Sequence, residues 1–523
     1  MSNRGTGWLP LAPRRRGRPI SRTPQQPQQS ASVPVKLSLA SLPAFSNDVA
    51  VPAYRRSALS AGIVHFGVGN FHRSHQAVYL DTLFNQGRDH DWAIIGAGVR
   101  PTDREMRARL AEQDLLTTVV EQEVDASRAR VTGAMIGFLP VGDADAIIAQ
   151  LADPAIRIVS LTVTEGGYFI DPASQKFDPA HPDILFDAAN GQAPRTVFGL
   201  LLAGLARRRA AGIAPFTVMS CDNIPGNGSV TRDTLVGLAG LMDSDLAGWV
   251  RDNVAFPNSM VDRITPATSP RERQMLQEDF GVLDHWPVFC EEFRQWVLED
   301  HFPSGRPALE RAGVRFVSDV APFEFMKIRI LNGGHATLAY AGGLLDIPYV
   351  HQAMLDPLIR SFVEKVERRE IIPTVPPVPD TDLAAYYSLI ERRFSNPRIG
   401  DTISRLCFDG SNRQPKFILP TAQDRLASGQ SVAGLALVSA LWARYCYGRT
   451  ESGAAIPPSD PEWDRLTWLA QAAKEKPEAW LTMTDIFGAL TADRHYVEAF
   501  TAALSSLWLH GTRETLRRYV ESE

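Results

Sequence analysis

The 523-residue sequence predicts a doubly wound α/β domain followed by a mainly α-helical domain. Four short apolar runs indicate strands at 62–67, 92–98, 156–165 and 215–223. Runs that are continuous rather than alternating are typical of strands buried on both faces of a parallel sheet. Segments with helical spacing, such as 197–212, lie between these runs. The repeated order of strand, helix and strand predicts the α/β class for this part of the chain.

Beyond about residue 320 the strand pattern fades and helical periodicity replaces it. The helices expected there are 324–341, 351–371, 381–394, 432–448, 461–473 and 493–510. A Pro-rich stretch at 371–380 connects two of them. We therefore expect an α/β domain at 36–317 and a helical domain at 318–523, with no internal repeat.

The first 35 residues differ in composition from the rest of the chain. They are rich in Arg, Pro, Gln and Ser, and the first acidic residue is Asp48. This composition predicts a disordered basic tail over residues 1–35. A nucleic-acid-binding arm and an organelle transit segment are the alternatives, although Pro and Gln would break the amphipathic helix that a transit peptide needs.

Composition and charge exclude several classes of function. The chain is 44% hydrophobic and 22% charged, which is typical of a globular protein with sizeable cores. Its net charge of −5 argues against nucleic acid or an anionic membrane surface as the main partner. No run of about 18 apolar residues occurs, and the N-terminus has no apolar segment, so we expect neither membrane spanning nor secretion.

The four cysteines are Cys221, Cys290, Cys407 and Cys446, and they lie far apart in the sequence. They form no Cys-x-x-Cys pair, so neither a disulfide framework nor a structural zinc site is expected. A reducing compartment, the cytoplasm, fits this usage best.

A glycine-containing turn, "FGVGNF", follows the first predicted strand and precedes a helix. Glycines at this place let the backbone approach a pyrophosphate at a helix N-terminus, as in Rossmann-like domains. The candidate cofactor contacts are Gly67, Val68, Gly69, Asn70 and Phe71. His72 stands where the third glycine of the usual fingerprint belongs, so an ordinary strand-to-helix turn is the alternative.

The residues after the second strand, "GAGVRPTDREM", carry a candidate for recognition of the adenosine ribose. A carboxylate at this place, here Asp103, accepts hydrogen bonds from the ribose hydroxyls of NAD. Arg100 nearby could accommodate a 2′-phosphate. We expect NAD as the cofactor, with NADP left open.

Polar residues interrupt the predicted helix 324–341. At about 100° per residue, Glu324, Asn332 and His335 fall within about 140° of Lys327, on a side that also carries core-type residues. Polar groups placed there must find partners or line a cavity, because unpaired burial is costly. A structural Lys327–Glu324 ion pair is one interpretation, and a catalytic set is the other.

The catalytic interpretation is a metal-independent secondary-alcohol dehydrogenase. Such an enzyme needs a base, donors for the developing alkoxide and a cofactor that accepts a hydride. Lys327 suits the base if burial lowers its pKa, and Asn332 and His335 suit the other roles. Asn223 and Asn227 in "SCDNIPGNG" follow the last predicted strand, where ligands bind in such sheets, with an Asx-turn loop as the alternative.

Six motifs together resemble the long-chain mannitol dehydrogenase family of polyol dehydrogenases. They are "GVGNFHRSHQAVYLD", "TEGGYFIDP", "PFTVMSCDNIPGNG", "FPNSMVDRITP", "MKIRILNGGH" and "NRQPKFILPT", spread over roughly residues 60 to 420. The resemblance implies a zinc-independent, NAD(P)-dependent oxidoreductase that interconverts a polyol and a ketose. The third glycine is absent in this family's loop as well.

The resemblance also implies roles for individual residues. Lys327 is the general acid/base of the family's K-x5-N-x2-H pattern. Asn332 and His335 assist oxyanion stabilisation and substrate orientation, and Asn223 is a second oxyanion asparagine. Glu324 matches a glutamate that gives the base a proton route to solvent. Substrate contacts are expected from Asp262 and Arg405, with Arg413 and Lys416 as weaker candidates.

The expected reaction is the oxidation of mannitol to fructose. Fructuronate or tagaturonate reduction and arabinitol oxidation are alternatives within the family, and Arg405 keeps an anionic sugar acid open because arginine binds carboxylates in bidentate fashion. A non-catalytic NAD-binding sensor is the alternative from another class. We expect a small-molecule substrate, no nucleic-acid or membrane partner, and a monomer or weak homo-oligomer.

Overall fold

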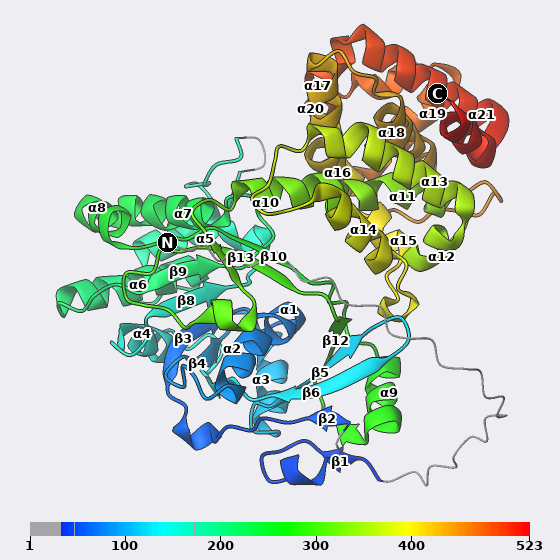
Figure 1. Ribbon diagram of the computed structural model, residues 1–523. Coiled ribbons are helices and arrows are strands. Elements are labelled where there is room, and N and C mark those ends of the chain that lie inside the picture. Colours follow the sequence, from blue (N-terminus) through cyan, green and yellow to red (C-terminus); the bar gives the residue numbers. More distant parts are fainter. Residues whose placement is uncertain (1–32, 46–47, 172–173, 523) are drawn as a thin grey trace, which may run out of the picture.

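The computed structural model describes residues 33–45, 48–171 and 174–522. Figure 1 shows two parts, a lower one built on sheets and an upper one built of helices. Most of the predicted tail, residues 1–32, lies outside the described residues. The first element is the short strand β1 (Val35–Lys36), which pairs with β11 (Val282–Leu283).

A five-stranded sheet forms the centre of the lower part. Its strand order is β7-β4-β3-β8-β9, and every neighbouring pair is parallel. The strands are β3 (Ala61–Phe66), β4 (Ala93–Ala97), β7 (Met135–Phe138), β8 (Ile158–Leu161) and β9 (Thr217–Ser220). All four predicted strands belong to this sheet, and the Rossmann-like doubly wound fold is confirmed.

Two hydrophobic cores cover the faces of this sheet. Val64 and Phe66 of β3 point into one core, and Ile63 points into the other. The helices of the first core are α4 (Ala144–Ala152), α6 (Val197–Ala210), α7 (Asn227–Met242) and α8 (Ser244–Asn253), whereas α2 (Gln76–Asn85) and α3 (Asp103–Ala111) cover the second. Burial on both faces explains why the strands read as continuous apolar runs.

Two smaller sheets were not predicted from the sequence. One has the order β12-β5-β6-β2, with β12 (Val288–Glu291), β5 (Thr117–Gln122), β6 (Ser127–Thr132) and β2 (Val49–Ala50). The other consists of β10 (Ser259–Asp262), β13 (Gln295–Glu299) and β14 (Arg315–Val317). These strands are short and carry polar residues, so no continuous apolar run marks them.

The remaining elements of the lower part are short helices. They are α1 (Asn70–Ser74), α5 (Pro182–Ala189), α9 (Pro270–Phe280) and the 3₁₀ turns η1 (Leu42–Ala44), η2 (Arg56–Ala58), η3 (Glu165–Tyr168) and η4 (Leu309–Ala312).

The upper part is helical, as predicted. Its first helix contains α10 (Ala321–Met326), the π-helical segment η5 (Lys327–Asn332) and α11 (Gly333–Leu344). The other predicted helices are α12 (Val350–Leu355), α13 (Pro357–Val366) with the π segment η6 (Glu367–Ile371), α14 (Leu383–Phe394), α18 (Ala433–Cys446), α19 (Trp463–Glu475) and α21 (Arg494–Glu521). Elements that were not predicted are α15 (Ile403–Cys407), α16 (Gly410–Phe417), α17 (Leu419–Ala427), α20 (Thr484–Phe487), η7 (Ile372–Thr374), η8 (Pro397–Ile399), η9 (Pro477–Thr482) and η10 (Gly488–Ala492).

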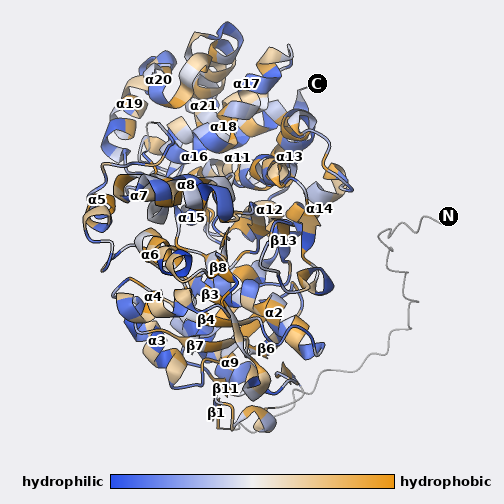
Figure 2. Cartoon of the chain, turned by 90° about the vertical axis from the view of Figure 1, so that its left-hand side faces the viewer, coloured by the Kyte–Doolittle hydropathy of each residue, from blue (hydrophilic) through white to orange (hydrophobic). Residues whose placement is uncertain are grey.

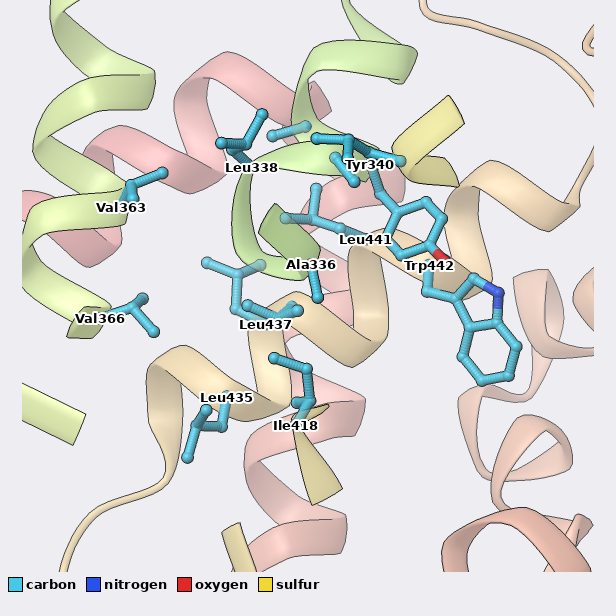
Figure 3. Packing of buried hydrophobic residues seen from close by; sticks show 14 of the residues in the cluster. Ala336, Leu338, Tyr340, Val363, Val366, Ile418, Leu435, Leu437, Leu441 and Trp442 are labelled. Atoms are coloured by element: carbon cyan, nitrogen blue, oxygen red, sulfur yellow. The ribbon is translucent and has the colours of Figure 1, made fainter. Parts of the chain in front are cut away.

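Helices α11 and α18 form the centre of this part. Figure 3 shows Leu338 and Tyr340 of α11 packed with Leu441 and Trp442 of α18. Nearly every residue of both helices is buried, as expected for helices that are apolar on all sides. Figure 2 shows hydrophobic and hydrophilic residues interleaved along outer helices such as α3 and α19.

Within the described residues, no helix combines the length and the hydropathy needed to cross a bilayer. The four cysteines are buried and form no disulfide.

Leu441→Ala should lower the free energy of unfolding by about 2–5 kcal/mol, because it removes buried methyl groups and leaves a cavity. Leu441 is 1% exposed, whereas Leu509, in the same part, is 77% exposed. Leu509→Ala is therefore the matched control and should change stability by less than about 0.5 kcal/mol. Urea unfolding followed by far-UV circular dichroism measures both. Equal losses in the two variants would contradict the packing described here.

Candidate active site

Two cavities adjoin at the carboxyl ends of the parallel strands. The strand-end cavity, about 480 Å³, is lined by Gly67, Gly69 and Asp103 among others. The interdomain cavity, about 740 Å³, lies between the two parts of the chain and is lined by Asn223, Lys327, Asn332 and Lys416, with further residues. Gly166, Phe169 and His181 line both cavities. Ligands in the two cavities would therefore meet at this shared wall.

The glycine turn shapes the strand-end cavity. Gly67 has a φ of +91°, and a Cβ at this residue would lie 2.0 Å from the carbonyl oxygen of Thr162. Only glycine fits there. Val68 and Gly69 also line the cavity. The turn therefore leaves exposed backbone where a pyrophosphate would bind at the start of α1.

Asn70 and Phe71 point away from this cavity. Asn70 donates to the carbonyl oxygen of Pro266 at 3.2 Å, and the Phe71 ring stacks on His75 with the centroids 4.7 Å apart. His72, at the place of the third glycine, stacks on His65 at 3.5 Å and is buried. The structure thus brings three of the five predicted turn residues to the cavity.

Asp103 and Arg100 both line the strand-end cavity. The Asp103 carboxylate accepts a hydrogen bond from the backbone nitrogen of Arg100 at 3.1 Å. The Arg100 guanidinium donates to the carbonyl oxygen of Val163 at 3.3 Å. A carboxylate fixed in this way can accept hydrogen bonds from ribose hydroxyls.

The π segment η5 determines how the polar residues of the first helix are arranged. In a π-helix the backbone hydrogen bond joins residues five apart, so residues i and i+5 lie on one side. Lys327 and Asn332 are related in this way, and both line the interdomain cavity together with Glu324. The prediction from α-helical geometry placed Asn332 farther round the helix, because that geometry does not include the extra residue of a π turn.

His335 lies behind these residues. Its side chain is buried, its ring stacks on Phe394 at 4.2 Å, and its Nε2 atom has no hydrogen-bond partner among the described residues. Burial lowers the pKa of His335 well below 6.5, and Arg405 and Arg413 lower it further. The imidazole is therefore neutral. His335 lines neither cavity, so the structure does not bring this predicted residue to the lining.

Lys327 is held by two neutral acceptors. Its Nζ atom donates to Oδ1 of Asn223 at 2.7 Å and to the carbonyl oxygen of Val261 at 2.6 Å. Burial is the main cause that lowers the pKa of Lys327 below 10.5; Arg393 acts in the same direction, and Asp262 and Glu324 oppose it. Because the Asn223 oxygen accepts from Lys327, the Asn223 amide nitrogen remains to donate to an oxyanion in the cavity.

Glu324 titrates near neutrality at the edge of the same cavity. Its carboxylate accepts hydrogen bonds from the backbone nitrogen of Gly226 at 3.1 and 3.2 Å. Burial raises the pKa of Glu324 to about 7, against the lowering effects of Gly226 and Lys327. A carboxyl group with this pKa can exchange protons with solvent at neutral pH.

The predicted substrate contacts fall into two groups. Lys416 is exposed and lines the interdomain cavity. Asp262 is buried and accepts from Arg393 at 2.6 and 2.9 Å. Arg405 is paired with Asp401 at 2.6 Å, and Arg413 donates to the carbonyl oxygen of Leu406 at 2.9 Å. Of these residues the structure brings Lys416 to the lining, whereas protein groups already bind the other three.

Asn227 has a structural role. It is fully buried, donates to the carbonyl oxygen of Ser259 at 2.7 Å and accepts from the backbone nitrogen of Ser259 at 2.9 Å.

Sequence reasoning missed the segment that separates the two cavities. Thr164 and Phe169 have φ values of +68° and +52°, which are strained for residues other than glycine. Asp222 holds this segment by accepting from the backbone nitrogens of Val163 and Thr164, both at 2.9 Å, and from the hydroxyl of Tyr168 at 2.7 Å. The glycine pair in "TEGGY" was the available signal for an unusual backbone.

Sequence reasoning also missed Arg393. It stands beside the exposed Arg392 in "LIERRFSNP", where no local pattern distinguishes a buried arginine from an exposed one.

Comparisons with known proteins agree over nearly the whole chain. The family model for the mannitol dehydrogenase Rossmann domain matches residues 61–311, and that for the mannitol dehydrogenase C-terminal domain matches residues 319–508. The chain is 59% identical to mannitol 2-dehydrogenase of Cereibacter sphaeroides over 91% of this chain and 100% of the relative. It is 42% identical to mannitol 2-dehydrogenase of Aspergillus terreus over 93% and 100% of the two chains.

Solved structures agree with these matches. The ternary complex of Pseudomonas fluorescens mannitol 2-dehydrogenase with NAD and D-mannitol is 43% identical, with a TM-score of 0.84 over 94% of this chain and 100% of that chain. A D-sorbitol dehydrogenase in substrate-free form is 34% identical, with a TM-score of 0.85 over 92% and 100%.

The pKa of Glu324 predicts a pH-dependent change in stability. Between its ordinary pKa of 4.5 and about 7, the folded state keeps the proton that the unfolded state loses, so Glu324 lowers stability as the pH rises. Glu324→Gln removes this dependence while keeping an acceptor for Gly226. The variant should therefore gain more stability over the wild type at about pH 8 than at about pH 5. Urea unfolding at both values measures this, and an equal difference at the two values would contradict the assigned pKa.

Proposed function

The chain belongs to the mannitol dehydrogenase family, and on that premise we propose that it oxidises D-mannitol to D-fructose with NAD, without a catalytic metal. The observation that carries the proposal is the Lys327 amine, buried at the cavity edge and held by Asn223 and Val261. Two similar proteins are mannitol 2-dehydrogenases, and one of them was solved with NAD and D-mannitol bound.

The residues of the interdomain cavity would carry the proton chemistry. Lys327, unprotonated, accepts the proton of the C2 hydroxyl as general base. The amide nitrogens of Asn223 and Asn332 donate to the developing alkoxide. His335, which lies behind these residues, would assist in orienting the substrate. The cofactor, when bound, accepts the hydride from C2. Burial supports this role of Lys327, because it disfavours the ammonium form.

Glu324 would return the proton to solvent. It lies three residues before Lys327, and burial raises its pKa to about 7, above that of an exposed carboxyl. A group with this pKa can accept a proton from Lys327 and release it to water at neutral pH.

The cofactor would bind across the strand-end cavity. Gly67, Val68 and Gly69 face the pyrophosphate, and Asp103 accepts from the adenosine ribose. Arg100 lies beside Asp103 and could pair with a 2′-phosphate, so NADP remains the second cofactor to test.

We place the domain boundary at residues 317 and 318, between β14 and α10.

An uncharged polyol is the substrate class that these contacts favour. Arg405, the residue that could bind a sugar-acid carboxylate, is already paired with Asp401 at 2.6 Å. Lys416 is the candidate for a hydroxyl at the far end of the substrate. Arg413 and Asp262, which are bound to other protein groups, would support the site without touching the substrate.

We expect a monomer or a weak homo-oligomer, located in the cytoplasm.

Initial rates of NADH and NADPH oxidation with fructose, fructuronate, tagaturonate and xylulose test the proposal. Fructose with NADH should give the highest kcat/KM. Asp103 favours a ribose without a 2′-phosphate, and Arg405, which could bind a sugar-acid carboxylate, is paired with Asp401. Consumption of cofactor with none of the sugars, despite tight NADH binding, would favour the non-catalytic sensor instead.

Lys327→Ala should lower kcat for mannitol oxidation by about 10²–10⁴-fold, the usual contribution of a general base. NADH affinity should stay close to that of the wild type, since Lys327 lines the interdomain cavity rather than the strand-end cavity. Steady-state kinetics and fluorescence titration with NADH measure the two quantities. Retention of wild-type turnover by this variant would refute the assignment of the base.

A further inference from the structure

A buried ion cluster joins the two domains directly behind the Lys327 amine. Arg393, in the last turn of α14, donates from Nη1 and Nη2 to the two oxygens of Asp262 at 2.6 and 2.9 Å. It also donates from Nε and Nη2 to the two oxygens of Glu291 at 2.8 and 2.6 Å. The three side chains are between 3% and 6% exposed. We call them the Arg393 cluster.

The Arg393 cluster lies next to the base through the backbone of β10. Lys327 donates to the carbonyl oxygen of Val261, and Asp262 is the next residue of the strand. A buried carboxylate beside a lysine is the natural counterion for its ammonium group. In the structure both Asp262 oxygens are occupied by the Arg393 guanidinium instead, and the Lys327 amine contacts only neutral oxygens among its hydrogen-bond partners in the described chain.

We infer that Arg393 is a positioning residue for the catalytic base: by binding Asp262 through two hydrogen bonds, it prevents this carboxylate from pairing with the Lys327 ammonium. The inference rests on the proposed function of Lys327. The same contacts clamp the helical domain onto β10 and β12, so domain closure and the basicity of the amine depend on one side chain. A lysine paired with a buried carboxylate would stay protonated and would be a poor base.

The other charged groups around Lys327 are consistent with this role. Glu324 faces the amine from its own helix, and Asp262 and Arg393 face it from β10 and α14. His75 faces Asp262, and burial lowers the pKa of His75 to about 3, so this ring is neutral and cannot replace the arginine. Glu291 is bound by Arg393 and by the backbone nitrogen of Ile264 at 2.6 Å.

The test is the pH dependence of kcat/KM for mannitol oxidation, which rises as the base loses its proton. Arg393→Gln frees Asp262, so the rise should move to higher pH by about one to two units. Adding Asp262→Asn to this variant removes the competing carboxylate, and the rise should return to within about half a unit of the wild type. Both effects are required, since a purely structural arginine would lower the rate without moving the profile.

A second pair of variants keeps the inference testable if Arg393→Gln does not fold. Removing Arg393 alone leaves two buried carboxylates unpaired, which is strongly destabilising. Arg393→Gln combined with Glu291→Gln keeps the net charge of the cluster and still frees Asp262, so it replaces the single variant if that one does not fold. Its partner for comparison carries Asp262→Asn as a third substitution.

Arg398→Gln is the matched control. Arg398 also links the domains, donating to the carbonyl oxygen of Val124 at 3.1 Å, but has no contact with Asp262. This variant should leave the pH profile unchanged.

Labelling of the Lys327 amine with acetic anhydride across the pH range, read by peptide mass spectrometry, gives a second measurement that needs no turnover. Its midpoint should move with the same variants and by the same amount. If the wild type did not oxidise mannitol, the proposed function would fail while this titration still tested Arg393. Unchanged midpoints in a folded variant that lacks Arg393, or no reversal by Asp262→Asn, would overturn the inference.

Discussion

The burial of one amine between two domains is the constraint on which the site depends. Lys327 comes from the first helix of the upper part, and its acceptors come from the loop after β9 and from β10 of the lower part. Neither domain alone could exclude water from this amine. Contact between the domains therefore both forms the interdomain cavity and disfavours the charged form of the lysine, as the proposed role of general base requires.

The parallel sheet was predictable because both of its faces are buried. Continuous apolar runs then mark each strand, and all four runs proved to be neighbours in one sheet. The smaller sheets escaped prediction because their strands, such as β6 with the sequence SRARVT, alternate with charged residues and depend on partners distant in sequence. Long apolar helices were predictable for the same reason as the main sheet, whereas short ones such as α15 depend on tertiary packing.

The candidate site was predictable where one local pattern holds several residues. Lys327, Asn332 and Glu324 share one helix, and Gly67 and Gly69 share one turn, so their sequence spacing carried the information. The α-helical angle for Asn332 was wrong in detail, because nothing in "KIRILN" indicates a π turn. Arg393 and Asp222 act through contacts with residues far along the chain, and a single sequence holds no trace of such pairs.

The strained segment Thr164–Phe169 has a thermodynamic consequence. Because Gly166 and Phe169 line both cavities, ligands bound in the two cavities would contact the same segment. Any work that one ligand does in ordering this segment is work that the second ligand is spared. Linkage then requires reciprocity: the factor by which the first ligand changes the affinity for the second equals the factor in the opposite direction. Asp222, which accepts hydrogen bonds from this segment, thus supports a wall that both ligands would contact.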